Sequence, residues 1–338
     1  MFATRFLPRV LRGLVAAAAV TLTTSAFAQV TVDPKLPKYE KSSGAVSGNI
    51  KSIGSDTMNN LMTFWAEGFQ KMYPNVLVEI EGKGSSTAPP ALIQGTATFG
   101  PMSRPMKGSE IDDFEKKYGY KPTELRTGID MLAIYVHRDN PIAKKGLTFA
   151  QIDAIFSKTR KGGFANDIKT WGDVGLTGEW ADKPISLYGR NSASGTYGFF
   201  KEHVLAKGDY KDTVKEQPGS SSVVSGVAGD KYGIGYSGIG YKTADVAAIP
   251  VALDSKSDYV SPEPDKAGEY PIARFLLVYM NYKPGSEIDA LRGEFIKYIF
   301  SREGQNDVVR DGYLPVSAAV AKQDLAKVGI GEKSASSN

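Results

Sequence analysis

Four short segments of the chain combine glycine with serine or threonine, and each follows a predicted strand. Hydroxyl groups and the free backbone N–H groups at a helix start donate hydrogen bonds, so turns of this kind attract anions. An arginine adds a charged donor that can bind two oxygens of a tetrahedral anion. The segments are 54–58 (GSDTM), 84–87 (GSST), 102–104 (MSR) and 190–196 (RNSASGT). The chemistry that they predict is the capture of an oxyanion.

Each of these turns, taken singly, is better explained as a helix N-cap than as a ligand site. Ser, Thr and Asp are the residues that most often cap the start of a helix. Four such turns at predicted strand ends favour a ligand site instead, because open α/β sheets bind their ligands beyond the carboxyl ends of the strands. The set therefore predicts a cradle of hydrogen-bond donors.

Strand and helix patterns alternate along most of the chain, and the four turns lie where a predicted strand ends. Short aliphatic runs predict strands, and glycine-containing turns lead from them into amphipathic helices. Strands that alternate with helices are typical of an α/β protein with open, largely parallel sheets. The predicted strands are 49–53, 76–80, 97–100, 131–136, 185–189 and 275–280, and the predicted helices include 109–118, 149–156, 195–205 and 287–301.

The two most apolar strands, 131–136 and 275–280, are suited to cross between two lobes. The first lobe is then predicted to combine 48–136 with 275–327, and the second to comprise 137–274. A ligand held between two lobes engages all of its donors only when the lobes close, so the division predicts hinge closure.

The ends of the chain predict export. Residues 1–28 have the order of a secretory signal peptide, with three arginines, an apolar run and small residues before a cleavage site after Ala28. Residues 29–47 are rich in Pro, Lys, Ser and Gly and predict a flexible arm, and residues 328–338 predict a flexible tail. The apolar run is short for a membrane span, and the chain has no cysteine through which a lipid could tether it. We therefore expect a free periplasmic protein.

Composition and missing motifs exclude several other functions. The net charge of +4 is small and the basic residues are scattered, which does not fit a nucleic-acid binder. With no cysteine and only two histidines, His137 and His203, the chain offers no cluster of metal ligands. It has no G-x-x-x-x-G-K-[ST] phosphate loop, and the run 232–241 is more typical of a strand with tight turns than of a dinucleotide loop. We expect no metal, no cofactor and no nucleic-acid partner.

The four turns, in this order and spacing, resemble those of the phosphate-specific periplasmic binding proteins that supply the Pst-type phosphate ABC transporter. The resemblance covers roughly residues 48–315. Its most specific part is 190–196, which is similar to the family's R-x-x-x-S-G-T, and 234–236 (IGY) resembles part of a later G-I-G-Y segment. The resemblance implies a type II periplasmic-binding-protein fold, in which two α/β lobes joined by two crossing strands enclose a dehydrated ligand.

Carried over position by position, the resemblance implies which residues bind phosphate. The hydroxyls and the N–H groups of the turns act as donors, Arg190 is the charged clamp, and Ser86 replaces Ser85 if the second turn is shifted by one residue. The implied phosphate-binding residues are Thr57, Met58, Ser85, Ser103, Arg190, Ser194, Gly195 and Thr196.

The third turn departs from the family pattern. Many members place an aspartate there that accepts the proton of HPO4(2−), whereas this chain has Ser103. A fixed acceptor rejects sulfate, which carries no proton at neutral pH, but a serine can both accept and donate. Asp56 is the candidate substitute acceptor, although a role as the cap of the following helix is the alternative that its position favours.

The expected function is high-affinity binding of inorganic phosphate by a monomer in the periplasm, with delivery to the membrane permease and ATPase subunits of an ABC transporter. One alternative is a receptor for another tetrahedral oxyanion, such as sulfate, molybdate or phosphonate. The other is a secreted phosphatase that uses the same cradle. An enzyme is not expected, because the sequence offers neither a base beside Ser194 nor a set of metal ligands.

Overall fold

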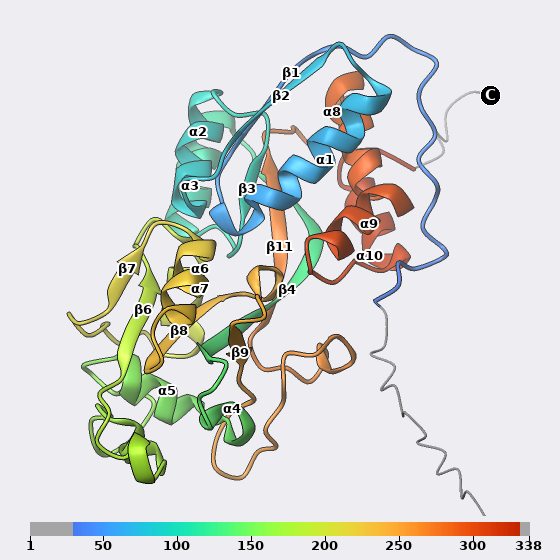
Figure 1. Cartoon of the computed structure of the whole chain (residues 1–338). Helices are drawn as coiled ribbons and strands as arrows, with labels where there is room; N and C mark the ends of the chain where they lie inside the picture. Colours follow the sequence, from blue (N-terminus) through green and yellow to red (C-terminus); the bar gives the residue numbers. More distant parts are fainter. Residues whose placement is uncertain (1–29, 332–338) are drawn as a thin grey trace, which may run out of the picture.

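Two α/β lobes are joined by two strands in the computed structural model, which describes residues 30–331 (Figure 1). The strands β4 (Thr123–His137) and β11 (Ala273–Met280) pair antiparallel and run from the upper lobe of Figure 1 toward the lower one. This is the predicted type II periplasmic-binding-protein arrangement. The expected signal peptide and its cleavage site lie outside the described residues.

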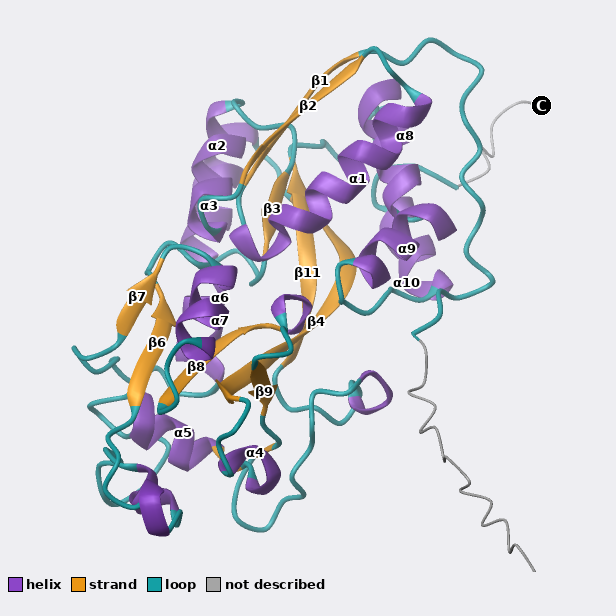
Figure 2. Ribbon diagram, in the orientation of Figure 1, coloured by secondary structure: helices purple, strands orange, loops and turns teal. Residues whose placement is uncertain are grey.

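The upper lobe is built from both ends of the described chain. Helices surround its strands (Figure 2), and the large buried side chains of Trp65, Phe69 and Phe295 pack in its main hydrophobic core. Its strands are β1 (Gly48–Ile53), β2 (Val76–Glu81) and β3 (Gly100–Met102), and its helices are α1 (Asn59–Met72), α2 (Ala88–Gln94), α3 (Gly108–Tyr118), α8 (Ala290–Ile299), α9 (Arg302–Arg310) and α10 (Ala318–Ala326).

The lower lobe has its own hydrophobic core, in which Trp171, Phe156, Phe200 and Tyr236 are buried. The ring of Phe200 stacks on that of Tyr236, with 3.9 Å between the ring centroids. The strands are β5 (Leu147–Thr148), β6 (Ser186–Arg190), β7 (Lys215–Gln217), β8 (Gly233–Gly238), β9 (Val246–Ala248) and β10 (Val251–Ala252), and the helices are α4 (Ile142–Lys145), α5 (Phe149–Phe156), α6 (Gly195–His203) and α7 (Ser220–Ala228). The run 232–241 contains β8, as its pattern predicts.

The prediction of largely parallel sheets is wrong for the largest sheet. Its strand order is β3-β11-β4-β8-β6-β7, and every pair that includes β4 or β11 is antiparallel. Strands joined by helices within one lobe are parallel, as in β1–β2 and β6–β8. The two crossing strands carry the chain between the lobes in opposite directions, and for that reason the sheet that contains them is mixed.

Several predicted elements have other limits in the structure. The third strand covers Gly100–Met102 rather than 97–100, and β4 extends over fifteen residues instead of six. The helix predicted at 287–301 is shorter, because Asp289 accepts a hydrogen bond from the Arg292 N–H and caps α8, while Ser301 caps the next helix. Capping side chains therefore determine where these helices begin, which hydrophobic periodicity alone does not locate.

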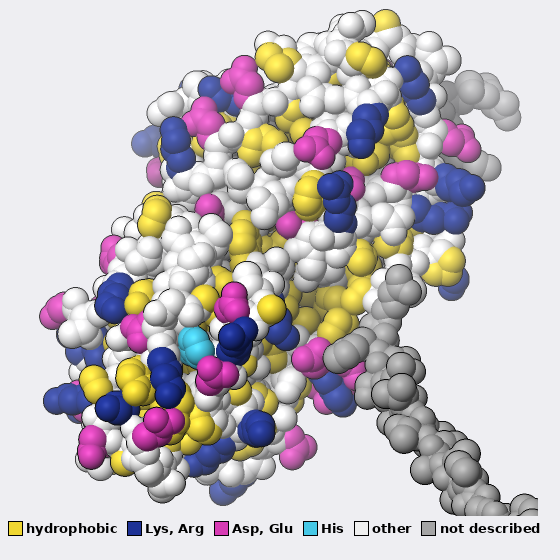
Figure 3. All heavy atoms as spheres, in the orientation of Figure 1, with side chains coloured by type: hydrophobic (Ala, Val, Ile, Leu, Met, Phe, Trp, Pro, Cys, Tyr) yellow, Lys and Arg dark blue, Asp and Glu magenta, His cyan; other side chains and the backbone are white. Residues whose placement is uncertain are grey.

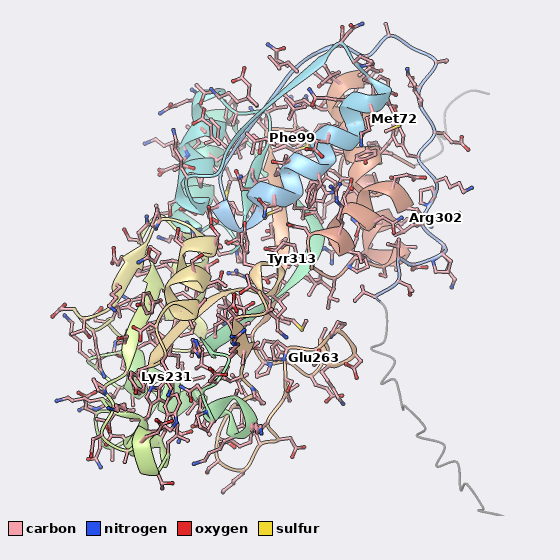
Figure 4. The ribbon with its side chains drawn as sticks, in the orientation of Figure 1. Met72, Phe99, Lys231, Glu263, Arg302 and Tyr313 are labelled. Atoms are coloured by element: carbon pink, nitrogen blue, oxygen red, sulfur yellow. The ribbon has the colours of Figure 1, made fainter. Side chains whose placement is uncertain are left out.

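Residues 30–47 pack on the upper lobe instead of forming the flexible arm that their composition predicts. Leu36 is 1% exposed within the upper core, and the backbone N–H of Arg302 donates to the Pro37 carbonyl at 2.9 Å. The Tyr39 hydroxyl donates to Glu294 at 2.7 Å. Figure 4 labels Arg302 beside this segment. At the other end Val328, placed in the predicted tail, is buried in the same core.

The surface fits the small net charge of the sequence. Lysine, arginine and acidic side chains are interspersed on the face drawn in Figure 3, without a basic stripe. Among residues 30–331 there is no helix with the length and apolar character needed to cross a bilayer.

Candidate functional site

Three of the four predicted turns lie side by side at one edge of the upper lobe. β1 and β2 are parallel, so their carboxyl ends meet at this edge. The Gly84 N–H donates to the Gly54 carbonyl at 2.8 Å, and the Ser55 N–H donates to the Pro101 carbonyl at 2.8 Å. The Tyr313 hydroxyl, which Figure 4 labels where the lobes meet, donates to the Thr57 carbonyl at 2.8 Å. Backbone and side-chain bonds thus fix all three turns relative to one another.

The fourth turn comes from the lower lobe. β6 ends at Arg190, and α6 begins after Ser194, whose hydroxyl oxygen accepts from the Tyr197 N–H at 3.3 Å. Ser194 is therefore the N-cap of α6, and Thr196 lies in the first turn of that helix. The helix start faces the upper-lobe turns, because the Ser86 N–H donates to the Ala193 carbonyl across the interface at 3.1 Å.

Four hydroxyls from these four turns form one buried cluster. The Thr57 and Thr196 hydroxyl oxygens are 2.9 Å apart, those of Ser85 and Ser103 are 3.3 Å apart, and those of Ser103 and Thr196 are 3.5 Å apart. The Ser103 N–H also donates to the Ser85 hydroxyl oxygen at 3.0 Å. None of the four residues is more than 1% exposed. We call Thr57, Ser85, Ser103 and Thr196 the hydroxyl cluster.

Gly195 allows the two lobes to meet at this cluster. A Cβ atom at residue 195 would lie 2.3 Å from the Ser85 hydroxyl oxygen and 2.7 Å from that of Ser103. Such distances are far inside van der Waals contact, so any side chain would push the helix start away from the upper lobe. The glycine predicted from the sequence therefore has a steric role in addition to its N–H group.

Arg190 is the last residue of β6, directly before the fourth turn, and only 1% of its surface is exposed. Its Nη1 donates to the Ser220 hydroxyl at 2.7 Å, and its Nη2 donates to the Pro218 carbonyl at 3.1 Å. Its Nε is buried and has no partner among the described residues. Burial lowers the pKa of Arg190, and the carboxylate of Asp56 opposes that shift. A guanidinium remains charged under these conditions, so the site contains a desolvated cation with an unused donor.

The structure contradicts the helix-cap role of Asp56 and shows contacts that the sequence did not predict. Its carboxylate does not cap the following helix. It lies 3.2 Å from Nη2 of Arg190 and accepts from the Ser220 N–H at 2.7 Å. Asp56 belongs to the upper lobe and both partners belong to the lower one, so its carboxylate links the lobes. The helix-cap interpretation was wrong because it considered only contacts that are local in the sequence.

The remaining predicted residues lie near the cluster but are engaged elsewhere. The Met58 side chain is buried in the upper core, and its N–H donates to the Ser55 carbonyl at 3.3 Å. The Ser86 hydroxyl accepts from Arg104 at 3.3 Å, whereas the Ser85 hydroxyl points into the cluster. The structure thus favours Ser85 over Ser86 as the residue of the second turn that faces the site.

The sequence analysis missed a buried ion pair on the crossing strands. Arg274 on β11 lies opposite Asp130 on β4, and Nη2 of Arg274 is 2.8 Å from Oδ2 of Asp130. The same nitrogen donates to the Thr196 hydroxyl at 2.8 Å, and Nη1 donates to the Ser103 carbonyl at 2.7 Å. The sequence offered one signal for this pair: a charged residue, Asp130 or Arg274, stands directly before each of the two strongly apolar predicted strands.

Within residues 30–331 no group of three or more His, Cys, Asp or Glu side chains is placed to hold a metal ion. His137 accepts from the Asp139 N–H at 3.2 Å, and the ring of His203 packs against that of Phe199. Both histidines thus have structural contacts away from the hydroxyl cluster.

The site as a whole is a set of hydroxyl and N–H donors between two lobes, together with the two buried guanidinium groups of Arg190 and Arg274. These features define an anion receptor with the periplasmic-binding-protein fold. In agreement, the model of the PBP superfamily domain matches residues 40–303.

Similarity to individual proteins identifies a family within the PBP superfamily. The chain is 54% identical over 308 residues to the phosphate-binding protein PstS of Pseudomonas aeruginosa, an alignment that covers 90% of this chain and 94% of the relative. It is 30% identical to the PstS of Staphylococcus haemolyticus over 77% of this chain and 79% of the relative. A solved phosphate ABC transporter substrate-binding protein from Clostridium perfringens with bound phosphate matches with a TM-score of 0.65 and 26% identity, over 80% of this chain and all of that one. The chain therefore belongs to the PBP superfamily and, within it, to the PstS family of phosphate-binding proteins.

Proposed function

We propose that this chain binds inorganic phosphate between its lobes and delivers it to the permease and ATPase subunits of an ABC transporter. The hydroxyl cluster is the observation that carries the proposal, because it brings together one hydroxyl from each of the four predicted turns. The PstS relatives and the phosphate-bound neighbour support the choice of phosphate. We propose the periplasm as the site of action and removal of residues 1–28 on export.

The proposed binding residues are those that the turns supply. The hydroxyls of Thr57, Ser85, Ser103 and Thr196 donate to the anion, joined by N–H groups at the start of α6. Because Thr57 and Thr196 contact each other at 2.9 Å, an anion enters between them only when the lobes separate. Closure then surrounds the anion with donors in a dry site, where each hydrogen bond is stronger than in water.

The proposed hinge lies in the crossing strands, near residues 136 and 275, with lobes of 48–136 plus 275–327 and of 137–274. The chain acts as a monomer in this proposal, because a single chain supplies all four turns. Catalysis is not part of the proposal. Ser194 caps α6 with its hydroxyl oxygen, which gives this serine a structural role.

Calorimetric titration of the mature protein tests the proposal. We expect saturable binding of one phosphate per chain, with sulfate, molybdate and methylphosphonate bound more weakly in the same buffer. A phosphatase assay on the same preparation should give no turnover. Preferential binding of one of the other anions, or hydrolysis of a phosphoester that is lost on substitution of Ser194, would contradict it.

A further inference from the structure

Arg274 has more donors than the protein uses. A guanidinium carries five N–H groups. Its Nε and Nη2 donate to Oδ2 of Asp130 at 3.1 and 2.8 Å, Nη2 also donates to the Thr196 hydroxyl, and Nη1 donates to the Ser103 carbonyl. These four bonds leave one N–H of Nη1 without a partner among the described residues, although the side chain is only 3% exposed.

The partners of Arg274 are residues of the hydroxyl cluster. Because the Thr196 oxygen accepts from Arg274, the hydrogen of that hydroxyl must point to another acceptor. Arg274 therefore leaves the hydrogen of Thr196 available to an acceptor on the upper-lobe side, where the Thr57 hydroxyl oxygen lies 2.9 Å away. The bond to the Ser103 carbonyl fixes the backbone of the third turn in the same way.

A second guanidinium, that of Arg190 in the lower lobe, is close enough to Arg274 for their charges to interact. Arg190 has an unpartnered, buried Nε, and the nearby charge of Arg274 contributes to the lowering of its pKa after burial, the largest cause. Two buried cations that repel each other, each with an N–H to spare, are stabilised by an anion between them. Asp56 pairs with Arg190 and Asp130 pairs with Arg274, so each guanidinium has one carboxylate partner.

We propose that Arg274 is a second cationic contact for the bound anion, held in place by Asp130. The proposal rests on the proposed function and deepens it. Arg190 approaches the anion from the lower lobe, whereas Arg274 approaches from the crossing strands, next to the turn that contains Ser103. The site then recognises the negative charge of the ligand through two guanidinium groups, and a dianion binds better than a monoanion.

The two members of the ion pair are expected to act in opposite directions. Asp130→Asn keeps the shape of the side chain and leaves the charge of Arg274 uncompensated, so phosphate binding should be as tight as in the wild type or tighter. Replacing both residues, D130N with R274Q, gives a neutral pair that avoids a lone buried carboxylate. We expect the double variant to bind phosphate at least about tenfold more weakly than D130N alone. Arg274→Lys, which keeps the charge but not the planar fork, should fall between them.

The pH dependence separates a charge contact from a structural role. Phosphate changes from monoanion to dianion near neutral pH, so the affinity lost in the double variant should be greater at pH 8 than at pH 6. Arg126→Gln is the matched control, because Arg126 lies on β4 in an ion pair with Asp324, and it should leave the affinity unchanged. All variants are compared by calorimetric titration with phosphate after a thermal melt has established that they fold.

Equal phosphate affinities of D130N and the double variant would overturn the proposal. If both variants also bind phosphate more weakly than the wild type, the ion pair has a purely structural role. If the wild type itself fails to bind phosphate, the proposed function fails, and the same comparison of variants made with sulfate decides the role of Arg274.

Discussion

The two lobes contribute different chemistry to the site. The upper lobe supplies three neutral hydroxyls, from Thr57, Ser85 and Ser103, and the carboxylate of Asp56. The lower lobe supplies the buried cation Arg190 and the start of α6 with Thr196. The cation Arg190 and the helix-end donors therefore come from the lower lobe and the neutral hydroxyls from the upper one, while Arg274 on the crossing strands contacts both, through Thr196 and the Ser103 carbonyl. The difference suggests that the lower lobe attracts the anion and that the upper lobe completes its hydrogen bonds on closure.

Loss of the lower-lobe cation is expected to have the largest effect. Arg190→Ala removes a desolvated guanidinium and its unused Nε donor, so phosphate binding should weaken by at least about tenfold, or about 1.4 kcal/mol. Arg138→Ala is the control, because Arg138 forms an exposed ion pair with Asp245 in the same lobe. Calorimetric titration of both variants, with circular dichroism as the check on folding, measures the effect. Wild-type affinity in the Arg190 variant would remove its assignment as the clamp.

A substitution that adds one methyl group at Gly195 tests whether the lobes close at the hydroxyl cluster. Gly195→Ala would place a Cβ atom 2.3 Å from the Ser85 hydroxyl oxygen, so the lobes could not close fully and affinity should fall by about tenfold. Gly198→Ala on the same helix is the matched control, since its Cβ would meet Arg104 at an ordinary 3.4 Å. Small-angle scattering with and without phosphate should show less compaction in the Gly195 variant. Normal compaction and affinity in that variant would argue against closure at this point.

The hydroxyl side of the site is expected to set selectivity with a smaller effect on affinity. Ser103→Ala removes one neutral hydrogen bond, worth about 1 kcal/mol, and should change the ratio of phosphate to sulfate affinity. Asp56→Asn should instead weaken both anions alike, because the Asp56 carboxylate links the closed lobes through Arg190 and the Ser220 N–H and does not contact the cluster. Competition titrations of phosphate against excess sulfate distinguish the two variants. An unchanged ratio in both would exclude Ser103 and Asp56 as the source of selectivity.

The parts of the fold that depend on local patterns could be predicted from the sequence. The strand–turn–helix units, the hydroxyl-rich turns and the Arg190 segment are each visible within a few residues, and the structure brings four of their hydroxyls together. The Arg274–Asp130 pair joins residues 144 positions apart, and only the antiparallel register of β4 and β11 brings them together. The mixed sheet and the docked segment 30–47 likewise depend on contacts between distant parts of the chain.

A crystal structure of the mature protein with phosphate would show directly whether the four turns bind the anion. We expect one tetrahedral anion between the lobes, with the hydroxyls of Thr57, Ser85, Ser103 and Thr196 and the guanidinium of Arg190 within hydrogen-bond distance of its oxygens. Phosphate bound elsewhere, or bound between the lobes without contact to the hydroxyl cluster, would contradict it.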